Sequence, residues 1–332
     1  MIFSVGMSSR FPIDEVLDTV ELLDMGGIYS VLIEDEANYS NVYVLLALAA
    51  KRTKHIKIGT GVTNPLTRHP VITASAIATI DQISSGRALL GIGAGGTATM
   101  VALGVDTSRP VGKLKIVVPI LQKLLGGERV TSSEGPFPIR DVALGILPIR
   151  KIPIYIAGRG PRILEAGGLL ADGVIAGAGL FTPQAMAYAR ENILRGTNMV
   201  GRNIKEVDIV AWAYTSVSEN ADQAIEPIAR FAYLTARSAP ISVWQPTGLD
   251  ISFVEKVKKE AIPQGDFAHL VPQLALNQFG LAGTPSYCRK RLREMAEAGI
   301  EHVGLLVFPV PELGLKGTVE LVLSSVIKEF IN

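Results

Sequence analysis

The sequence has little cysteine and little histidine. Cys288 is the single cysteine in 332 residues, so the chain cannot form an internal disulfide framework, and a reducing, cytoplasmic compartment is the default expectation. The four histidines, His55, His69, His269 and His302, are scattered without the spacing of metal ligands. We therefore expect neither a disulfide-stabilised secreted protein nor a metal site.

The sequence also lacks an excess of charge and a long apolar run. Lys and Arg number 32 against 31 Asp and Glu, which argues against nucleic acid or an anionic membrane as a partner. Charged residues, Gly or Pro interrupt the apolar runs before they reach membrane-spanning length. Residues 1–10 lack a basic n-region and indicate a first strand rather than a signal peptide. The partner we expect is a small-molecule substrate.

Apolar, mostly β-branched segments are abundant, and helical patterns separate them. They lack alternation of apolar and polar residues, which is typical of parallel strands covered on both faces. The expected strands are 2–7, 30–34, 55–61, 87–94, 152–158, 173–177, 208–217 and 302–308. Eight strands with helical crossovers, and a final helix after the eighth, predict an α/β fold of the (β/α)8 TIM-barrel type. A doubly wound open sheet remains the alternative.

Two segments are longer than the repeating unit requires. Residues from about 126 to 150 indicate a loop or hairpin inserted after the fourth helix, and residues from about 219 to 281 indicate added helices between strands seven and eight. We expect residues 1–332 to form a single domain.

Helix punctuation supports this division. Thr182 is a candidate N-cap, Pro183 suits the first helical position, and Gly196 is expected just past the helix end. The same scheme is repeated over residues 284–299.

Glycines gather where the expected strands end. In a barrel of this type, the working residues lie on loops at the carboxyl ends of the strands. Four of these ends are rich in Gly or Ala. They are Gly61 after the third strand, Ala94 and Gly95 after the fourth, Gly158 and Gly160 after the fifth, and Gly177 and Ala178 after the sixth. One such loop is more simply a tight turn, but four on one face favour a bound cofactor whose surface approaches the backbone.

The stretch AGRGPRIL predicts an anion site. Pro161 suits the first turn of a helix, so the free amides around Gly160 would point at the strand end, and Arg159 would add positive charge. A phosphate is the natural ligand, and an ordinary helix start with solvated arginines is the alternative. GIGAGG matches a dinucleotide-binding pattern, but it follows the fourth strand and no acidic residue stands about twenty positions on, so we discount it.

Three consecutive acids, Glu34, Asp35 and Glu36, follow the second strand. At a strand mouth they can bond a cofactor ring or move protons, and clustered negative charges raise the pKa of at least one of them. A solvated acidic turn is the alternative, most of all for Glu36.

Three long stretches carry a family resemblance: NVYVLLALAAKRTKHIKIGTGVTNP, TASAIATIDQISSGRALLGIGAGG and IPIYIAGRGPRIL. In this order they resemble the luciferase-like flavin and deazaflavin oxidoreductases, and most closely the archaeal 5,10-methylenetetrahydromethanopterin reductases, which use coenzyme F420. The resemblance implies hydride transfer between reduced F420 and an organic substrate, possibly 5,10-methylenetetrahydromethanopterin or a related pterin that carries a one-carbon unit.

The resemblance also implies roles for individual residues. A non-prolyl cis peptide at Gly61-Val62 would support the deazaflavin ring, with Thr63 and Asn64 at the ring edge. Asp35 corresponds to the position that contacts the polar end of the ring. The remaining positions implied are cofactor-lining Gly95 and Thr99 and phosphate-binding Gly158 and Gly160.

The chain departs from the reductases where protons are handled. They carry Glu, His and an acid at positions where this chain has Gly6, Glu36 and Gly96. Glu34 or Glu36 is therefore the expected catalytic group. Two alternatives stay open: an FMN-dependent monooxygenase of the same superfamily, and a barrel that binds a flavin or deazaflavin without turnover. Luciferase-like barrels commonly pair, so a homodimer or higher homo-oligomer is expected.

Overall fold

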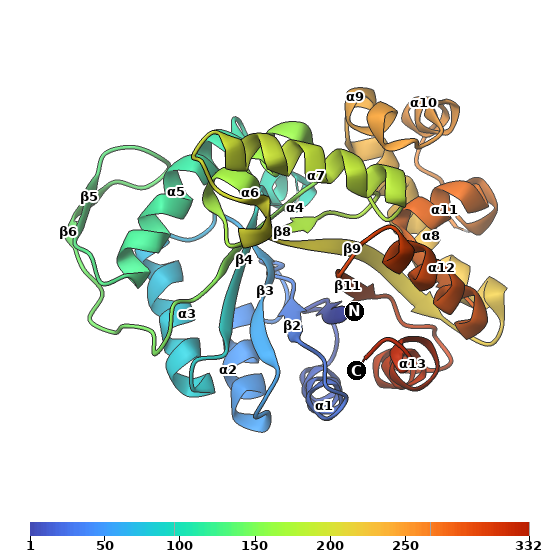
Figure 1. The fold of residues 1–332 in the computed structure, drawn as a ribbon, viewed down its shortest axis with the longest axis horizontal. Coiled ribbons are helices and arrows are strands. Elements are labelled where there is room, and N and C mark those ends of the chain that lie inside the picture. The colour runs from blue at the N-terminus through green and yellow to red at the C-terminus, as the bar shows by residue number, and fades with distance from the viewer. Residues whose placement is uncertain (96, 266, 332) are drawn as a thin grey trace.

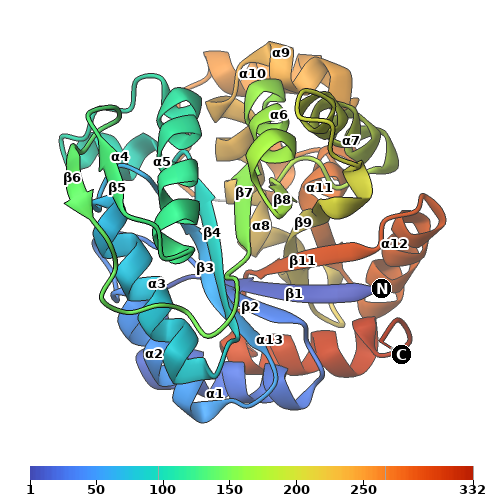
Figure 2. The same ribbon diagram turned by 60° about the vertical axis from the view of Figure 1, so that its left-hand side comes forward.

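The computed structural model describes residues 1–95, 97–265 and 267–331. Its central sheet closes into an eight-stranded parallel barrel, because β8 pairs with β9 and β11 pairs with β1. The barrel strands are β1 (Ile2–Met7), β2 (Ser30–Ile33), β3 (Lys57–Thr63), β4 (Ala88–Gly93), β7 (Ile154–Gly158), β8 (Gly173–Ala176), β9 (Asp208–Val217) and β11 (His302–Val307). The predicted TIM barrel is confirmed, and the open sheet is wrong. Figure 2 shows β1 beside β11, where the last strand meets the first.

Helices surround the barrel and cover the outer face of its strands (Figure 1). They are α1 (Ile13–Met25), α2 (Val42–Arg52), α3 (Pro70–Ser84), α5 (Pro110–Leu125), α6 (Pro161–Leu170), α7 (Pro183–Asn198), α12 (Pro285–Glu297) and α13 (Gly314–Val322), with the short 3-10 helix η1 (Ile204–Glu206) and the π-helix η4 (Leu323–Ile327). The short helix α4 (Thr97–Ala102) follows β4, and its Met100 lies at the barrel mouth. Within the described part of the chain, no helix is both long and apolar enough to cross a membrane.

Both predicted insertions are present. The first contains an antiparallel hairpin of β5 (Val130–Ser132) and β6 (Ile139–Val142), which lies at the left of both views (Figures 1 and 2). The second contains α8 (Ala221–Ser238), α9 (Ile241–Trp244), η2 (Gln245–Thr247), α10 (Ile251–Lys259), η3 (Ala268–Leu270), α11 (Gln273–Phe279) and β10 (Gly280–Gly283). β10 pairs with the carboxyl-terminal half of β9 and so fixes this insertion beside the barrel mouth.

One helix boundary differs from the prediction. Gly196 lies inside α7, which continues to Asn198. A Cβ atom at Gly196 would lie 2.0 Å from the carbonyl oxygen of Glu165, so this glycine permits close packing of α7 on α6 and is not a helix stop. Gly299, by contrast, does follow its helix with φ of +78°, as expected of a C-terminal glycine.

Alternation along the strands separates two faces. Side chains such as Val5, Ile58 and Leu90 face the helices in one buried cluster, and a second cluster, which includes Leu32 and Trp212, fills the barrel and continues into the insertion helices. The residue types are apolar on both faces, so the inner set becomes visible only from the strand register.

Candidate active site

A cavity of about 660 Å³ opens at the carboxyl ends of the barrel strands. Its walls come from the ends of β2, β3, β4, β7, β8 and β9, from the start of α5 and from the loop that joins α8 to α9. A groove of about 730 Å³ lies between α1 and the end of the chain, but its lining includes no part of the barrel mouth. The first cavity contains most of the residues that the sequence singled out, so it is the candidate site.

Glu34 points into the cavity. Ser30, Leu32 and Glu34 share the inner face of β2 and its extension, because successive side chains of a strand alternate. The pKa of Glu34 is raised to about 7, mainly by burial and in addition by the negative charge of Glu36. A carboxyl group with this pKa exchanges a proton near neutral pH, as a general acid requires.

Glu36 lines the same cavity, but its carboxylate is already occupied. Arg10 donates two hydrogen bonds to Glu36 Oε1, at 2.8 and 2.5 Å, and the Ser8 hydroxyl donates to Oε2 at 2.5 Å. The structure therefore gives the two acids different surroundings. Glu36 forms an ion pair with the loop after β1, whereas Glu34 is the acid whose pKa is shifted toward neutrality.

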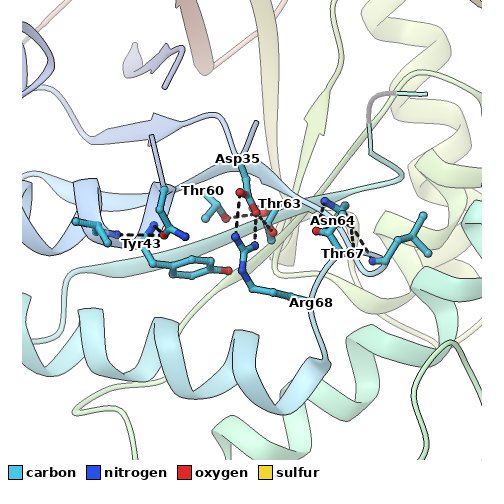
Figure 3. Close-up of polar contacts among 11 residues, drawn as sticks. Asp35, Tyr43, Thr60, Thr63, Asn64, Thr67 and Arg68 are labelled. Atoms are coloured by element: carbon cyan, nitrogen blue, oxygen red, sulfur yellow. Dashed lines mark hydrogen bonds and ion pairs between the residues drawn. The ribbon is translucent and has the colours of Figure 1, made fainter. Parts of the chain in front are cut away.

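Asp35 belongs to a buried cluster behind the end of β3. Its carboxylate accepts hydrogen bonds from Arg68 at 2.5 and 3.3 Å and from the Thr63 hydroxyl at 2.6 Å, and its side chain is only 5% exposed. The ring of Tyr43 lies 4.9 Å from the Arg68 guanidinium. Figure 3 shows Arg68 and Thr63 both directed at the Asp35 carboxylate, so this cluster holds the loop after β2 against β3.

The segment after Thr63 turns sharply. Asn64 accepts hydrogen bonds from the backbone amides of Leu66 and Thr67, both at 2.9 Å, and thereby closes the turn (Figure 3). The Gly61-Val62 peptide bond is cis, and both residues line the cavity. The side chain of Thr63 is fully buried and bonds Asp35, so of the predicted ring-edge pair only Asn64 lines the cavity.

The start of α6 offers unpaired backbone donors. The first intrahelical bond runs from the Leu164 amide to the Gly160 carbonyl, so the amides of Arg162 and Ile163 have no partner within the helix. No side chain of the described residues caps this end. Gly158 has no room for a Cβ atom, which would lie 2.2 Å from Ile163, whereas a Cβ at Gly160 would meet nothing closer than 3.9 Å. Such an end, open to the cavity, suits a phosphate.

The remaining predicted positions line the same cavity. Ala94, Gly95, Gly177 and Ala178 are all in its walls, and Gly95 has φ of +86°. Gly96 lies outside the described residues. Thr99 lies on α4, but its side chain is outside the described part of the structure.

Three aromatic residues of this region were missed by sequence reasoning. Trp212 and Tyr214 follow the inner alternation of β9 and line the cavity, and Trp244 comes from α9. The indole of Trp212 lies over Gly6 and Gly304, where Cβ atoms would approach it to 2.5 and 2.1 Å. Trp212 thus fills the space that side chains from β1 and β11 would otherwise occupy, and it forms part of the cavity floor.

Metal binding finds no support among the side chains that the structure describes. Residues 1–95, 97–265 and 267–331 hold no group of three or more His, Cys, Asp or Glu arranged to bind an ion. Asp208 and His302 are paired at 2.8 Å, but they lie at the amino-terminal ends of β9 and β11, away from the cavity.

The sequence matches a family model described as luciferase-like monooxygenase over residues 3–302. The 5,10-methylenetetrahydromethanopterin reductase of Methanolobus tindarius is 31% identical over 322 residues, covering 95% of this chain and 98% of the relative. The protein of the same name from Archaeoglobus fulgidus is 34% identical over 290 residues, covering 86% of each chain.

A solved structure gives the same picture. The coenzyme F420-dependent tetrahydromethanopterin reductase of Methanopyrus kandleri superposes with a TM-score of 0.86 at 29% identity, covering 99% of each chain. The similarity therefore includes both insertions as well as the barrel.

Proposed function

This chain belongs to the luciferase-like monooxygenase family, and from that membership we propose that it is an oxidoreductase that uses coenzyme F420. Two relatives above 30% identity, each aligned over at least 86% of this chain, are named 5,10-methylenetetrahydromethanopterin reductase, and the similar solved structure is named as a coenzyme F420-dependent reductase. The proposed reaction moves a hydride between reduced F420 and an organic substrate. The leading substrate is 5,10-methylenetetrahydromethanopterin or a related pterin that carries a one-carbon unit.

The observation that carries this proposal is the combination of two features in one cavity. An uncapped helix start at α6 lies in one wall, and Glu34, with its pKa near 7, lies in another. The first suits the phosphate of a cofactor, and the second suits a proton transfer that accompanies reduction. The volume of about 660 Å³ is within the usual range for a site that holds a small molecule.

The residues present fit the cofactor. Gly160 and the Arg162 and Ile163 amides would hold the phosphate, and the Gly61-Val62 segment, with no side chain at Gly61, would face the ring system. Asn64, Ala94, Gly95, Gly177 and Ala178 complete the lining. When bound, F420 supplies a two-electron hydride donor or acceptor, and the protein supplies orientation and exclusion of water.

Glu34 is the proposed proton-handling group. Its carboxyl group is uncharged below pH 7 and is then able to donate a proton to the reduced substrate from the cavity wall. Glu36 and Arg10 act indirectly, since the charge of Glu36 raises the pKa of Glu34 and that of Arg10 lowers it. Asp35 positions the loop through Arg68.

The first experiment is a fluorescence titration of the purified protein with F420 and, separately, with FMN at one salt concentration. We expect preferential binding of F420, followed by oxidation of reduced F420 when a methylene-tetrahydropterin is added. Preference for FMN together with oxygen consumption would replace the proposal with the monooxygenase. Tight F420 binding without hydride transfer to any acceptor would favour the non-catalytic binding barrel.

We also propose that the chain works as a homodimer or higher homo-oligomer in the cytoplasm, with residues 1–332 as one domain. Val44 and Leu48 on α2 and Ile72 on α3 are exposed apolar residues on neighbouring helices, which suits a contact between copies. A single cysteine, Cys288, leaves the described chain without a disulfide, which suits a reducing compartment. Light scattering of the purified protein tests the assembly.

A further inference from the structure

Arg159 lines the same cavity as Gly158 and Gly160, at the end of β7. On β7 and its extension, Tyr155, Ala157 and Arg159 occupy alternate positions, and all three belong to the inner face of the barrel or its mouth. The guanidinium lies 5.6 Å from the ring centre of Trp244, on α9 of the second insertion. Arg159 therefore lies against α9 of the insertion, whose Val243 also approaches the start of α6 near Gly160.

This arginine has no anionic partner among the residues that the structure describes. No carboxylate forms an ion pair with it, and burial lowers the pKa of its guanidinium, with only the neighbouring Tyr214 opposing the shift. Arginine nevertheless keeps its charge, because its ordinary pKa is above 12. Arg159 is half-buried in the cavity wall and its charge is unpaired, so an anion that enters the cavity gains an interaction that the empty protein lacks.

The neighbouring side chains leave the N–H donors of the Arg159 guanidinium free to bind an anion at one edge. An aromatic ring on one side of a guanidinium leaves its N–H donors free at the edge, where they match a carboxylate or phosphate. Trp244 is held in place, since it is fully buried and its indole N–H donates to the Ala236 carbonyl at 3.0 Å. Tyr214 lies on the neighbouring wall and donates to or accepts from Thr235 at 2.9 Å.

We propose that Arg159, backed by Trp244 and beside Tyr214, forms a second anion subsite in the barrel mouth, separate from the backbone amides of α6. It takes a carboxylate or phosphate group of a bound small molecule. This part of the proposal rests on the proposed function. It gives the anionic group two sources: the acidic tail of the deazaflavin cofactor, or an acidic substituent of the hydride acceptor. The subsite makes an anionic group a requirement of one of the two ligands.

The test compares R159M with R190M. Arg190 is exposed on the outer helix α7, so its removal changes the net charge equally without touching the cavity. Dissociation constants are measured by fluorescence for F420 and for the ribityl compound that lacks its phosphate and tail, and KM is measured for the acceptor. We expect R159M to weaken one anionic ligand about 10- to 100-fold while R190M stays within about 3-fold.

The arms identify the source. Weaker binding of F420 with unchanged binding of the ribityl compound assigns the subsite to the phosphate or acidic tail of the cofactor. Unchanged cofactor binding with a raised KM assigns it to the acceptor. Equal values for wild type and R159M in every arm overturn the proposal.

A cofactor-free measurement separates this proposal from the function on which it rests. The chain contains two tryptophans, Trp212 and Trp244, one in the cavity lining and one against Arg159. Inorganic phosphate, added at constant ionic strength, should change their fluorescence in wild type and R190M, and should change it less in R159M, which keeps only the α6 amides. An identical response in R159M overturns the subsite even if F420 binds. Failure of wild type to bind F420, with the phosphate response intact, overturns the function instead.

Discussion

At the scale of single residues, the two neighbouring acids have separable roles. Replacing Glu34 by Gln should lower hydride transfer by about 10²–10⁴-fold, because a proton donor is lost from the cavity wall. The fall in wild-type kcat/KM above pH 7, where Glu34 ionises, should disappear in E34Q. A pH profile of both enzymes checks this, and an unchanged alkaline limb in E34Q would exclude Glu34 as the donor.

Stability gives an independent reading of the same residue. Because the pKa of Glu34 is about 7 in the folded chain and ordinarily 4.5, the folded state binds this proton more tightly. The free energy of unfolding of wild type should therefore fall between pH 4.5 and pH 7 through this group. E34Q lacks the penalty, so at pH 8 it should be more stable by at most about 3 kcal/mol, with no difference at pH 4. Denaturant unfolding at both pH values measures the effect.

Glu36 provides the matched comparison. Its ion pair with Arg10 is partly exposed, so E36Q should cost less than about 1 kcal/mol of stability. Removing its negative charge, and freeing that of Arg10, should lower the pKa of Glu34. The alkaline limb of the E36Q profile should accordingly move to lower pH while most of the turnover remains. Loss of turnover equal to that of E34Q would instead make Glu36 the donor.

Gly160 tests the phosphate site without disturbing the fold. A Cβ there would meet nothing closer than 3.9 Å, and an acidic N-cap favours a helix start. We expect G160D to bind F420 at least about 10-fold more weakly, by repulsion of phosphate, while its melting temperature is unchanged or raised. G160A is the control, with near wild-type affinity. Equal binding by G160D would remove the phosphate from α6. Gly61 is unsuitable for such a test, because a Cβ would lie 2.6 Å from Leu32.

The sequence located this site better than it assigned roles within it. Glu34, Asp35 and Glu36 are consecutive and all three line the cavity, so composition alone cannot assign their roles. The register of β2 turns Glu34 inward, while Arg68 and Thr63 hold the Asp35 carboxylate. The direction of Arg159 could not be predicted from the sequence either. Both faces of a buried parallel strand are apolar, so only the closed barrel shows that Arg159 faces inward.

At the scale of elements, β1, β9 and β11 together form the cavity floor. Gly6 and Gly304 leave the volume that the Trp212 indole fills, so the three positions are coupled. G304A should displace the indole and cost about 1–3 kcal/mol, and W212F should recover part of that loss in the double variant. G145A is the control, since a Cβ there meets nothing within 4 Å. Additive effects in a double-mutant cycle would show that the floor is not built this way.

Element boundaries were predicted where local chemistry decides them. Thr284 caps α12 through the Tyr287 amide, and Gly299 ends it with positive φ, both readable from the sequence. Gly196 was misplaced because its role is tertiary: it lets α7 approach α6. The position of the second insertion likewise depends on the pairing of β10 with β9, and this long-range pairing leaves no local signal in the sequence.

At the scale of the whole molecule, the two ends of the barrel are chemically distinct. The carboxyl end holds the cavity, and the amino end holds a polar layer within the strands. In that layer Ser4 lies 2.7 Å from His302 Nε2, His302 Nδ1 lies 2.8 Å from Asp208, and the Tyr155 hydroxyl donates to Asp208 at 2.6 Å. Each polar group satisfies another, so this end is closed by hydrogen bonds and the opposite end stays available for ligands.

This division predicts opposite effects of changes at the two ends. Burial opposes the ionisation of Asp208, but hydrogen bonds from His302 and Tyr155 outweigh it and hold the pKa of Asp208 below its ordinary value of 3.8. Its carboxylate therefore stabilises the fold fully above about pH 4, and the contribution is lost as pH falls through the lowered pKa. D208N should cost about 1–3 kcal/mol at pH 7, with the difference from wild type vanishing in stronger acid.

Binding of F420 to folded D208N should be unchanged, because the substitution lies at the far end of the barrel, whereas G160D should show the reverse pattern. Weakened F420 binding by fully folded D208N would mean that the two ends are coupled through the interior layers, and that the amino end contributes to ligand binding.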